Sequence, residues 1–254
     1  VGTACKALGD GLILRSFLPN DIERCAEFFV RVFAEDDGVE PDERIGYWVR
    51  DLFRLDDNPD RKRYGFLVEK EHSMEIVSAL LTIPQTWKYA GIPIPIGRPE
   101  PVATDKAYRK RGLVRAMFQE FHRTSEASGD LMQVISGIPW FYRQFGYEMA
   151  VEQGGNRSGF ITQVEAAEKK KITGYSARAA TAKDIAFLAN LYQDSTSRYL
   201  LHCPLDEHWW KKEIDLKHPD NIEKNGIFIL EKPGGQRAGL FIISKELDDQ
   251  AVFI

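Results

Sequence analysis

The chain has 254 residues, 43% of them hydrophobic, which is enough for one or two cores of ordinary domain size. Its formal net charge of -4 argues against a general nucleic-acid surface, which needs a broad basic face. The three cysteines lack Cys-x-x-Cys spacing, the histidines lack metal-ligand spacing, and no apolar run approaches the roughly 20 residues that cross a bilayer, so we expect a cytoplasmic protein with no metal and no membrane partner.

The first part of the sequence predicts a strand, two helices and a strand pair. Residues 12–17 read as a strand, and Pro19-Asn20-Asp21 begins an amphipathic helix. A second amphipathic helix begins at Pro41-Asp42-Glu43. Residues 64–70 and 76–83 are apolar runs joined by a polar turn, which predicts two antiparallel strands.

Residues 87–104 contain several prolines and predict one or two further strands. Proline cannot donate a backbone N–H to a neighbouring strand. We therefore expect this stretch to be unsuited to a regular central strand. The prolines concerned are Pro93, Pro95, Pro99 and Pro101.

A basic turn that contains glycine follows within residues 102–114, between an extended run and a helix. Arg109, Lys110 and Arg111 place three cations where the helix begins, and Gly112 lets the backbone approach a ligand. Unpaired N–H groups and the positive end of the helix dipole attract an anion there, and the arginines add charge-assisted hydrogen bonds. The turn suits a pyrophosphate and therefore a nucleotide-type cofactor, although a solvated charge run is the alternative reading.

The helix after this turn has apolar residues at i, i+3, i+4 and i+7, and Ser128-Gly129 ends it. Residues 131–136 read as a short buried strand, so that strand, turn, helix and strand form a crossover unit. Neither a Walker A loop nor the three-glycine dinucleotide fingerprint is present. The apolar stripe comprises Val114, Met117, Phe118 and Phe121.

The later part of the sequence repeats features of the first. Leu14-Arg15 and Asp21-Ile22 correspond at constant spacing to Ala177-Arg178 and Asp184-Ile185. A period of about one small domain indicates duplication, not a solenoid. A further correspondence, at nearly the same spacing, joins residues 65–70 to residues 227–232.

This repeat predicts two domains, at residues 1–160 and 174–254, joined by a linker at 161–173. In the second domain we expect a helix from about Ile185, another near Asp206, and strands near 227–231 and 238–243. No second basic turn with glycine follows. The chain stops in the apolar run 251–254, where a fourth strand is expected, so we expect a fragment with an incomplete second copy.

Two motifs resemble those of GCN5-related N-acetyltransferases (GNAT). Residues 109–114, Arg-Lys-Arg-Gly-Leu-Val, are similar to the Arg/Gln-x-x-Gly-x-Gly/Ala loop that binds the coenzyme A pyrophosphate, except that Val114 stands at a Gly or Ala position. Residues 139–147, Pro-Trp-Phe-Tyr-Arg-Gln-Phe-Gly-Tyr, resemble the Tyr-x-x-Phe-Gly-Tyr block after the fifth strand. The likeness is greatest to the enhanced intracellular survival branch, which has tandem acetyltransferase-like domains.

The resemblance implies an α/β fold with a mixed, mostly antiparallel central sheet flanked by helices, and acetyl-CoA as co-substrate. It implies that Val102, Ala103 and Thr104 bind the pantetheine arm through their backbone, and that Tyr142 protonates the departing sulfur. Simple packing is the alternative role for Tyr142. The loop that binds the pyrophosphate comprises Arg109, Lys110, Arg111, Gly112, Leu113 and Val114.

The general base is not determined by the sequence. Glu100 and the tract Glu35-Asp36-Asp37 are candidates, and ordinary surface carboxylates are the alternative for each. The resemblance also allows deprotonation through water or through a terminal carboxylate. We expect Tyr147 to be structural and His122 to be solvated on the polar side of the helix.

The function that we predict is acetyl transfer from acetyl-CoA to a primary amine of a small molecule or of a lysine side chain. A non-catalytic acyl-CoA-binding or sensing module is the competing class, and a protein with a purely interacting second domain is a third. The acidic net charge is compatible with a cationic acceptor. The sequence does not determine whether the protein forms a homo-oligomer.

Overall fold

The computed structural model describes residues 5–55, 64–138, 140–151, 158–160, 174–243 and 251–253. The chain forms two compact units that are not continuous in sequence. None of the helices that the structure describes combines the length and hydrophobicity of a transmembrane span. The first unit comprises Val1–Glu148, Tyr199–Cys203 and Asp220–Ile222, and the second comprises Met149–Arg198, Pro204–Pro219 and Glu223–Ile254.

The predicted domain boundaries, 1–160 and 174–254, stay predictions. The predicted linker, 161–173, lies outside the described residues.

The first unit contains the predicted strand, two helices and strand pair, followed by a third helix. Its helices are α1 (Ile22–Asp37), α2 (Glu43–Arg54) and α3 (Leu113–Ala127), with 3-10 turns η1 (Pro19–Asp21), η2 (Lys106–Tyr108) and η3 (Tyr142–Phe145). Its strands are β1 (Cys5–Gly9), β2 (Leu12–Ser16), β3 (Gly65–Lys70), β4 (Ile76–Tyr89), β5 (Ile92–Thr104), β6 (Met132–Gln133) and β9 (Leu201–His202).

These strands form one mixed sheet in the order β1-β2-β3-β4-β5-β6, and β9 pairs with the far end of β4. All neighbours are antiparallel except β5 and β6, which are parallel and are joined through α3. A parallel pair needs such a crossover. The predicted crossover unit and the mixed, mostly antiparallel sheet are therefore confirmed.

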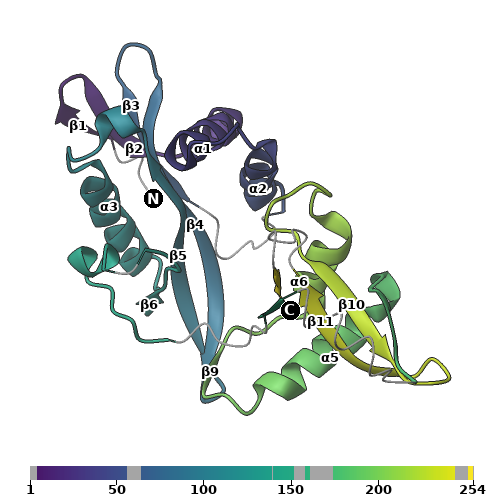
Figure 1. Cartoon of the computed structure of the whole chain (residues 1–254). Helices are drawn as coiled ribbons and strands as arrows, with labels where there is room; N and C mark the ends of the chain where they lie inside the picture. The colour runs from purple at the N-terminus through teal and green to yellow at the C-terminus, as the bar shows by residue number, and fades with distance from the viewer. Residues whose placement is uncertain are drawn as a thin grey trace. The chain divides into compact units, whose positions relative to one another are not determined.

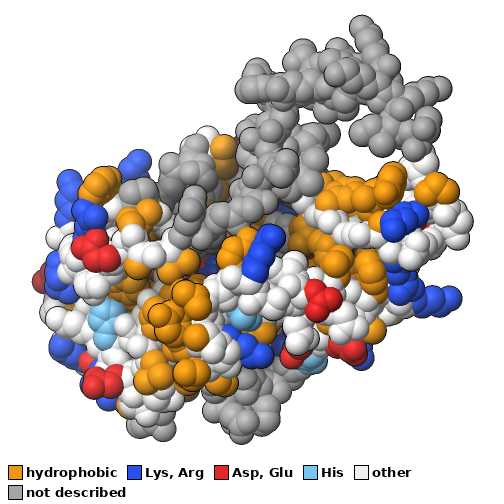
Figure 2. All heavy atoms as spheres, turned by 90° about the horizontal axis from the view of Figure 1, so that it is seen from below, with side chains coloured by type: hydrophobic (Ala, Val, Ile, Leu, Met, Phe, Trp, Pro, Cys, Tyr) orange, Lys and Arg blue, Asp and Glu red, His pale blue; other side chains and the backbone are white. Residues whose placement is uncertain are grey.

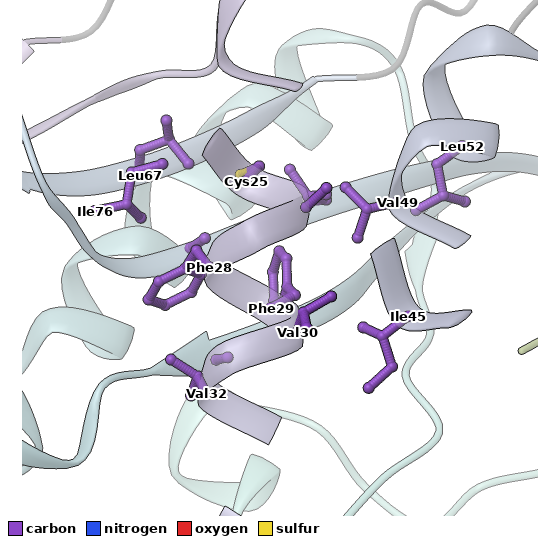
Figure 3. Packing of buried hydrophobic residues seen from close by; sticks show 14 residues of the cluster. Cys25, Phe28, Phe29, Val30, Val32, Ile45, Val49, Leu52, Leu67 and Ile76 are labelled. Atoms are coloured by element: carbon purple, nitrogen blue, oxygen red, sulfur yellow. The ribbon is translucent and has the colours of Figure 1, made fainter. Parts of the chain in front are cut away.

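Helices cover both faces of this sheet (Figure 1). On one face, α1 and α2 bury a cluster that includes Phe29, Val49 and Leu67 (Figure 3). On the other face, α3 buries Met117 and Phe121 against β2, β3 and β4. The two apolar faces of the central strands explain why β3 reads as a nearly unbroken hydrophobic run.

The expectation for the proline-rich stretch was wrong for most of its length, because β5 is a continuous strand that pairs with β4, with one shift of register between Pro99 and Val102. A two-residue turn after Tyr89 places Pro93, Pro95 and Pro99 at positions that do not exchange hydrogen bonds with β4. On the other side, Pro95 uses only its carbonyl, which accepts from the Leu131 N–H at 3.0 Å. The missing N–H groups of these three prolines are therefore not needed, and Pro101 lies where the register shifts.

The prediction of a buried strand at 131–136 was also wrong in extent. Only Met132 and Gln133 pair with β5, and they are half-buried. Leu131 is 75% exposed. In the described chain, β6 has a strand neighbour on one side only, and residues 132–135 are half-buried. Hydrophobic side chains are prominent on the face seen in Figure 2.

The second unit has the helices and strands expected from the repeat. Its sheet has the order β11-β10-β8 and is antiparallel, and its core gathers around Leu188, Trp210 and Ile229. Its elements are β7 (Ser158–Phe160), β8 (Ser176–Ala179), η4 (Ala182–Asp184), α5 (Ile185–Thr196), α6 (Glu207–Lys211), the π-helical turn η5 (Lys212–Leu216), β10 (Gly226–Glu231), β11 (Arg237–Ile243) and β12 (Ala251–Phe253).

Each unit contains a similar ion-pair arrangement, centred on Arg15 of β2 in the first unit and on Arg178 of β8 in the second. In the first unit, the Arg15 guanidinium donates to both oxygens of Asp21 at 2.7 and 2.8 Å and to Glu69 at 2.7 Å.

In the second unit, Arg178 donates to both oxygens of Asp184 at 2.8 and 2.9 Å and to Glu231 at 2.9 Å. The strand pairing also shifts register at the same place, after Val68 in one unit and after Leu230 in the other. The two units therefore share local geometry as well as sequence.

The last strand differs from expectation. Among the described residues, β12 pairs antiparallel with β7, outside the β11-β10-β8 sheet. It is therefore not a fourth strand of that sheet.

Candidate active site

The basic turn lies between the end of β5 and the start of α3. Lys110 and Gly112 both have left-handed backbone, with φ of 63° and 74°. Left-handed residues close together in a turn direct backbone N–H groups into one concavity, which is a common anion site. A Cβ on Gly112 would meet no atom within 4 Å, so the glycine is needed for its conformation and the space beside it is open.

The first turn of α3 has unsatisfied donors. Gly112 is its N-cap residue and provides no side-chain cap, and the turn contains no acidic residue in this described segment. A helix N-terminus without an internal anion is a ready site for phosphate oxygens. α3 has 15 residues, so its dipole is well developed at this end.

The cations of the turn are exposed. The Arg109 Nε donates to the Thr104 carbonyl at 3.1 Å, which fixes the start of this side chain against β5. Arg111 lies over the Tyr108 ring, 4.9 Å from its centroid. Lys110 is exposed between them. The structure thus brings the three predicted cations to the open end of α3.

Leu113 and Val114 point into the protein instead of toward the turn. Leu113 is buried, and Val114 packs against the same core cluster. The valine at the family's Gly or Ala position is therefore accommodated by packing. Its backbone N–H still belongs to the first turn of α3.

The end of β5 offers backbone groups away from β4. The Asp105 N–H donates to Val77 on β4 at 2.9 Å, and alternate residues of an antiparallel strand point in opposite directions. Val102 and Thr104 therefore turn their backbone groups to the other side, whereas those of Ala103 face β4. Because β6 pairs with β5 only at Ile96 and Gly97, this edge of β5 is not used by β6.

Tyr142 begins the short helix η3 and packs against Phe118 of α3, with ring centroids 5.9 Å apart. Burial raises the pKa of Tyr142, and the negative charge of Glu100 raises it further. The phenol is therefore protonated at neutral pH. Val102, Leu113 and Tyr142 all contact one core cluster, so this cluster connects the end of β5, the basic turn and the phenol.

The candidate bases have different surroundings. Glu100 is half-buried on β5, forms an ion pair with Arg98, and is near enough to influence Tyr142. Glu35 pairs with Arg31 at 3.3 Å and is exposed. The side chains of Asp36 and Asp37 lie outside the described residues. Of the described candidates, Glu100 is the one with an electrostatic link to Tyr142.

His122 is not simply solvated, as the sequence suggested. Its Nε2 lies 3.3 Å from the Tyr147 hydroxyl, and its ring packs against Phe118 and Phe121. Burial lowers the pKa of His122. Tyr147 is enclosed by the same aromatic cluster, and burial raises its pKa. The Tyr147 ring in turn contacts Tyr142, with ring centroids 6.1 Å apart.

Two further arginines contact elements of this site, and neither was predicted from the sequence. Arg31 of α1 donates to Asp105 at 2.8 Å, and Asp105 in turn accepts from the Ala107 N–H at 2.9 Å, which fixes the start of the basic turn. Arg115 of α3 contacts Gln144 of η3. The position of Arg115 next to the basic turn was the available signal. No sequence signal links Arg31 to the turn, because 74 residues separate it from Asp105.

The family model described as Acetyltransferase (GNAT) domain matches residues 14–150. Comparison with curated proteins gave no significant match. The matched range includes the basic turn, α3 and η3.

Solved structures have the same fold at low identity. A probable N-acyltransferase from Enterococcus faecalis V583 is 15% identical, with a TM-score of 0.62, over 94% of this chain and 56% of that one. A GCN5-related N-acetyltransferase from Kribbella flavida is 20% identical, with a TM-score of 0.57, over 93% and 56%. Saccharomyces cerevisiae N-myristoyltransferase with bound myristoyl-CoA is 12% identical, with a TM-score of 0.61, over 98% and 65%.

The chain therefore spans between 56% and 65% of the length of these three structures.

Proposed function

The chain belongs to the GNAT acetyltransferase family, and we propose that it transfers an acetyl group from acetyl-CoA to a primary amine. The observation that carries the proposal is the combination of an uncapped, basic helix N-terminus with a protonated tyrosine on the same core cluster. The first feature suits a diphosphate and the second suits a thiolate leaving group.

The residues of the turn fit coenzyme A. The N–H groups at Gly112, Leu113 and Val114 would bind the diphosphate, with Arg109 and Arg111 adding charge-assisted bonds. The outward backbone groups of Val102 and Thr104 would pair with the amides of the pantetheine arm, as an added strand would. Ala103 supports this edge through its pairing with β4. Lys110 contributes charge.

Acetyl-CoA supplies the activated thioester. The neutral amine attacks the thioester carbon, the carbon–sulfur bond breaks, and Tyr142 donates its phenolic proton to the departing sulfur. The raised pKa keeps that proton in place until it is needed. We propose Glu100 as the group that accepts the amine proton, directly or through water, because it is the described candidate linked to Tyr142.

The acceptor that we propose is a small amine or a lysine side chain. The formal net charge of -4 favours approach of a cationic acceptor. The cytoplasmic location, the lack of a metal or nucleic-acid partner, and the oligomeric state stay predictions from the sequence.

We further propose that the second unit is a diverged copy of the first, as in the tandem domains of the enhanced intracellular survival branch. The repeated contacts of Arg15 and Arg178 support this view, because two carboxylate partners recur at matching positions. The matched register shifts in the strand pairs support it independently.

Thiol release from acetyl-CoA with a panel of amines tests the activity. We expect release that depends on the amine and a new acetylamine detected by mass spectrometry. Myristoyl-CoA in place of acetyl-CoA tests whether a longer acyl group is accepted. Coenzyme A binding without any amine-dependent thiol would favour the competing class, a binding or sensing module.

A further inference from the structure

Arg115 lies on the first turn of α3, beside the site proposed for the diphosphate. Its guanidinium contacts a different element. Nη2 donates to Gln144 Oε1 at 3.0 Å, and Nη1 reaches the Gln144 carbonyl at 3.4 Å. The same guanidinium lies over the Phe145 ring, 5.3 Å from its centroid. Arg115 is therefore directed at η3, the helix that begins with Tyr142.

Two other residues of α3 hold the same segment. Phe118 stacks on Phe145, with centroids 4.6 Å apart and ring planes 5° apart. His122 lies 3.3 Å from the Tyr147 hydroxyl. Arg115, Phe118 and His122 are three and four residues apart, which places them on one face of α3. One face of the helix thus supports the segment from Tyr142 to Tyr147.

η3 needs such support because it has little stability of its own. It is a four-residue 3-10 helix without a side-chain cap, and it ends at Gly146 with φ of 91°. The hydrogen bonds of a 3-10 turn have poor geometry, and so short a helix is marginal in water. The position of the Tyr142 ring is therefore set by contacts with α3.

We propose that Arg115 is a positioning residue that ties η3 to α3 and so holds the Tyr142 phenol in place for proton transfer. The inference rests on the proposed acetyltransferase function. α3 then joins two tasks in one helix, because its first turn binds the diphosphate and the face that carries Arg115, Phe118 and His122 orients the acid. Arg115 acts on turnover, whereas Arg109, in the same basic segment, acts on cofactor affinity.

Kinetics and calorimetry with coenzyme A separate these two roles. For Arg115→Ala we expect kcat to fall about three- to tenfold, because a charged hydrogen bond at an exposed site is lost, with Kd for coenzyme A within about twofold. For Arg109→Ala we expect the Kd for coenzyme A to rise about tenfold. Arg123→Ala is the matched control, because Arg123 is exposed on the same helix and pairs with Glu120 at 2.8 Å.

Variants at the partner test the contact itself. Gln144→Ala should reproduce the fall in kcat, and the double variant should be no slower than either single variant, because both remove one interaction. Arg115→Lys should restore part of kcat, since an ammonium can donate to Gln144 but lacks the planar fork. Thermal unfolding checks that each variant is folded.

A readout that needs no substrate is the titration of Tyr142, followed by NMR of ring-labelled tyrosine and assigned with Tyr142→Phe. In Arg115→Ala we expect its raised pKa to move toward the ordinary value of about 10 as the ring becomes more exposed.

Two kinetic outcomes would overturn the proposal. One is a rise in Kd for coenzyme A with unchanged kcat, which would make Arg115 a diphosphate ligand. The other is no change in either quantity. If the wild type transfers no acetyl group to any amine, the acetyltransferase assignment fails, and the titration of Tyr142 still tests the role of Arg115. Identical titration curves of Tyr142 in the wild type and in Arg115→Ala would show that Arg115 does not hold Tyr142 in place.

Discussion

Asn221 donates from Nδ2 to Asp51 Oδ2 at 2.8 Å, although 170 residues separate them in the chain. Both side chains are buried, and Asp51 also accepts from Arg54 at 2.6 Å. The neighbouring Ile222 N–H donates to the Arg44 carbonyl at 3.2 Å. The late segment Asp220–Ile222 thus belongs to the first unit and forms hydrogen bonds with α2.

Removing this contact should destabilise the protein. Asn221→Ala leaves a buried carboxylate oxygen with one donor fewer, which costs about 1–3 kcal/mol. Chemical denaturation measures the change in the free energy of unfolding. Asn190→Ala, on an exposed position of α5, is the control and should change it by less than about 0.5 kcal/mol. Equal effects of the two substitutions would contradict this account.

Gly97 on β5 is required by close packing at the crossover. A Cβ there would approach Ser125 Oγ to 2.7 Å and Asp130 Oδ2 to 2.8 Å, and these two atoms are hydrogen-bonded to each other at 2.6 Å. Gly97→Ala should therefore cost about 1–3 kcal/mol in unfolding free energy. Gly239→Ala is the matched substitution on a strand, because its Cβ would meet no atom within 4 Å, and it should not destabilise. A neutral Gly97→Ala would show that the Ser125–Asp130 pair can shift.

Tyr142→Phe tests the acid directly. It keeps the ring contact with Phe118 and removes only the hydroxyl, so we expect kcat to fall about 10²-fold or more while coenzyme A binding is unchanged. Tyr89→Phe, at an exposed position at the tip of the β4–β5 hairpin, is the control and should retain full activity. Unchanged turnover in Tyr142→Phe would leave the residue a packing role only.

His122 should make the protein sensitive to mild acid. Burial lowers its pKa in the folded protein, so below the unfolded value of about 6.5 the unfolded chain binds more protons than the folded one. Stability is full above that pH and is lost as the pH falls toward the lowered folded pKa.

Denaturation at pH 7.5 and at pH near 5 measures this effect. His122→Gln should lose less stability between the two conditions than the wild type does. The same loss in both proteins would show that other groups dominate the acid sensitivity.

The sequence predicted elements whose signals are local. The phased apolar residues of α3 depend on spacing within one helix, and they pack into the core as predicted. The crossover from β5 to β6 followed from element order alone. Such features need no knowledge of distant partners.

The errors came from features that depend on neighbouring elements. Whether Pro95 disrupts a strand depends on which side of β5 carries a partner, and this is decided by pairing with β4 and β6. Whether residues 131–136 are buried depends on a second layer over β6. Arg115 was missed because its partner, Gln144, is 29 residues away.

The discontinuous first unit has a consequence for biosynthesis. Strand β9, which pairs with β4, and Asn221, which bonds Asp51, both come late in the chain. During translation the early part of that unit emerges from the ribosome long before these partners do. It must therefore persist in a less stable, incompletely bonded form until residue 222 has been released.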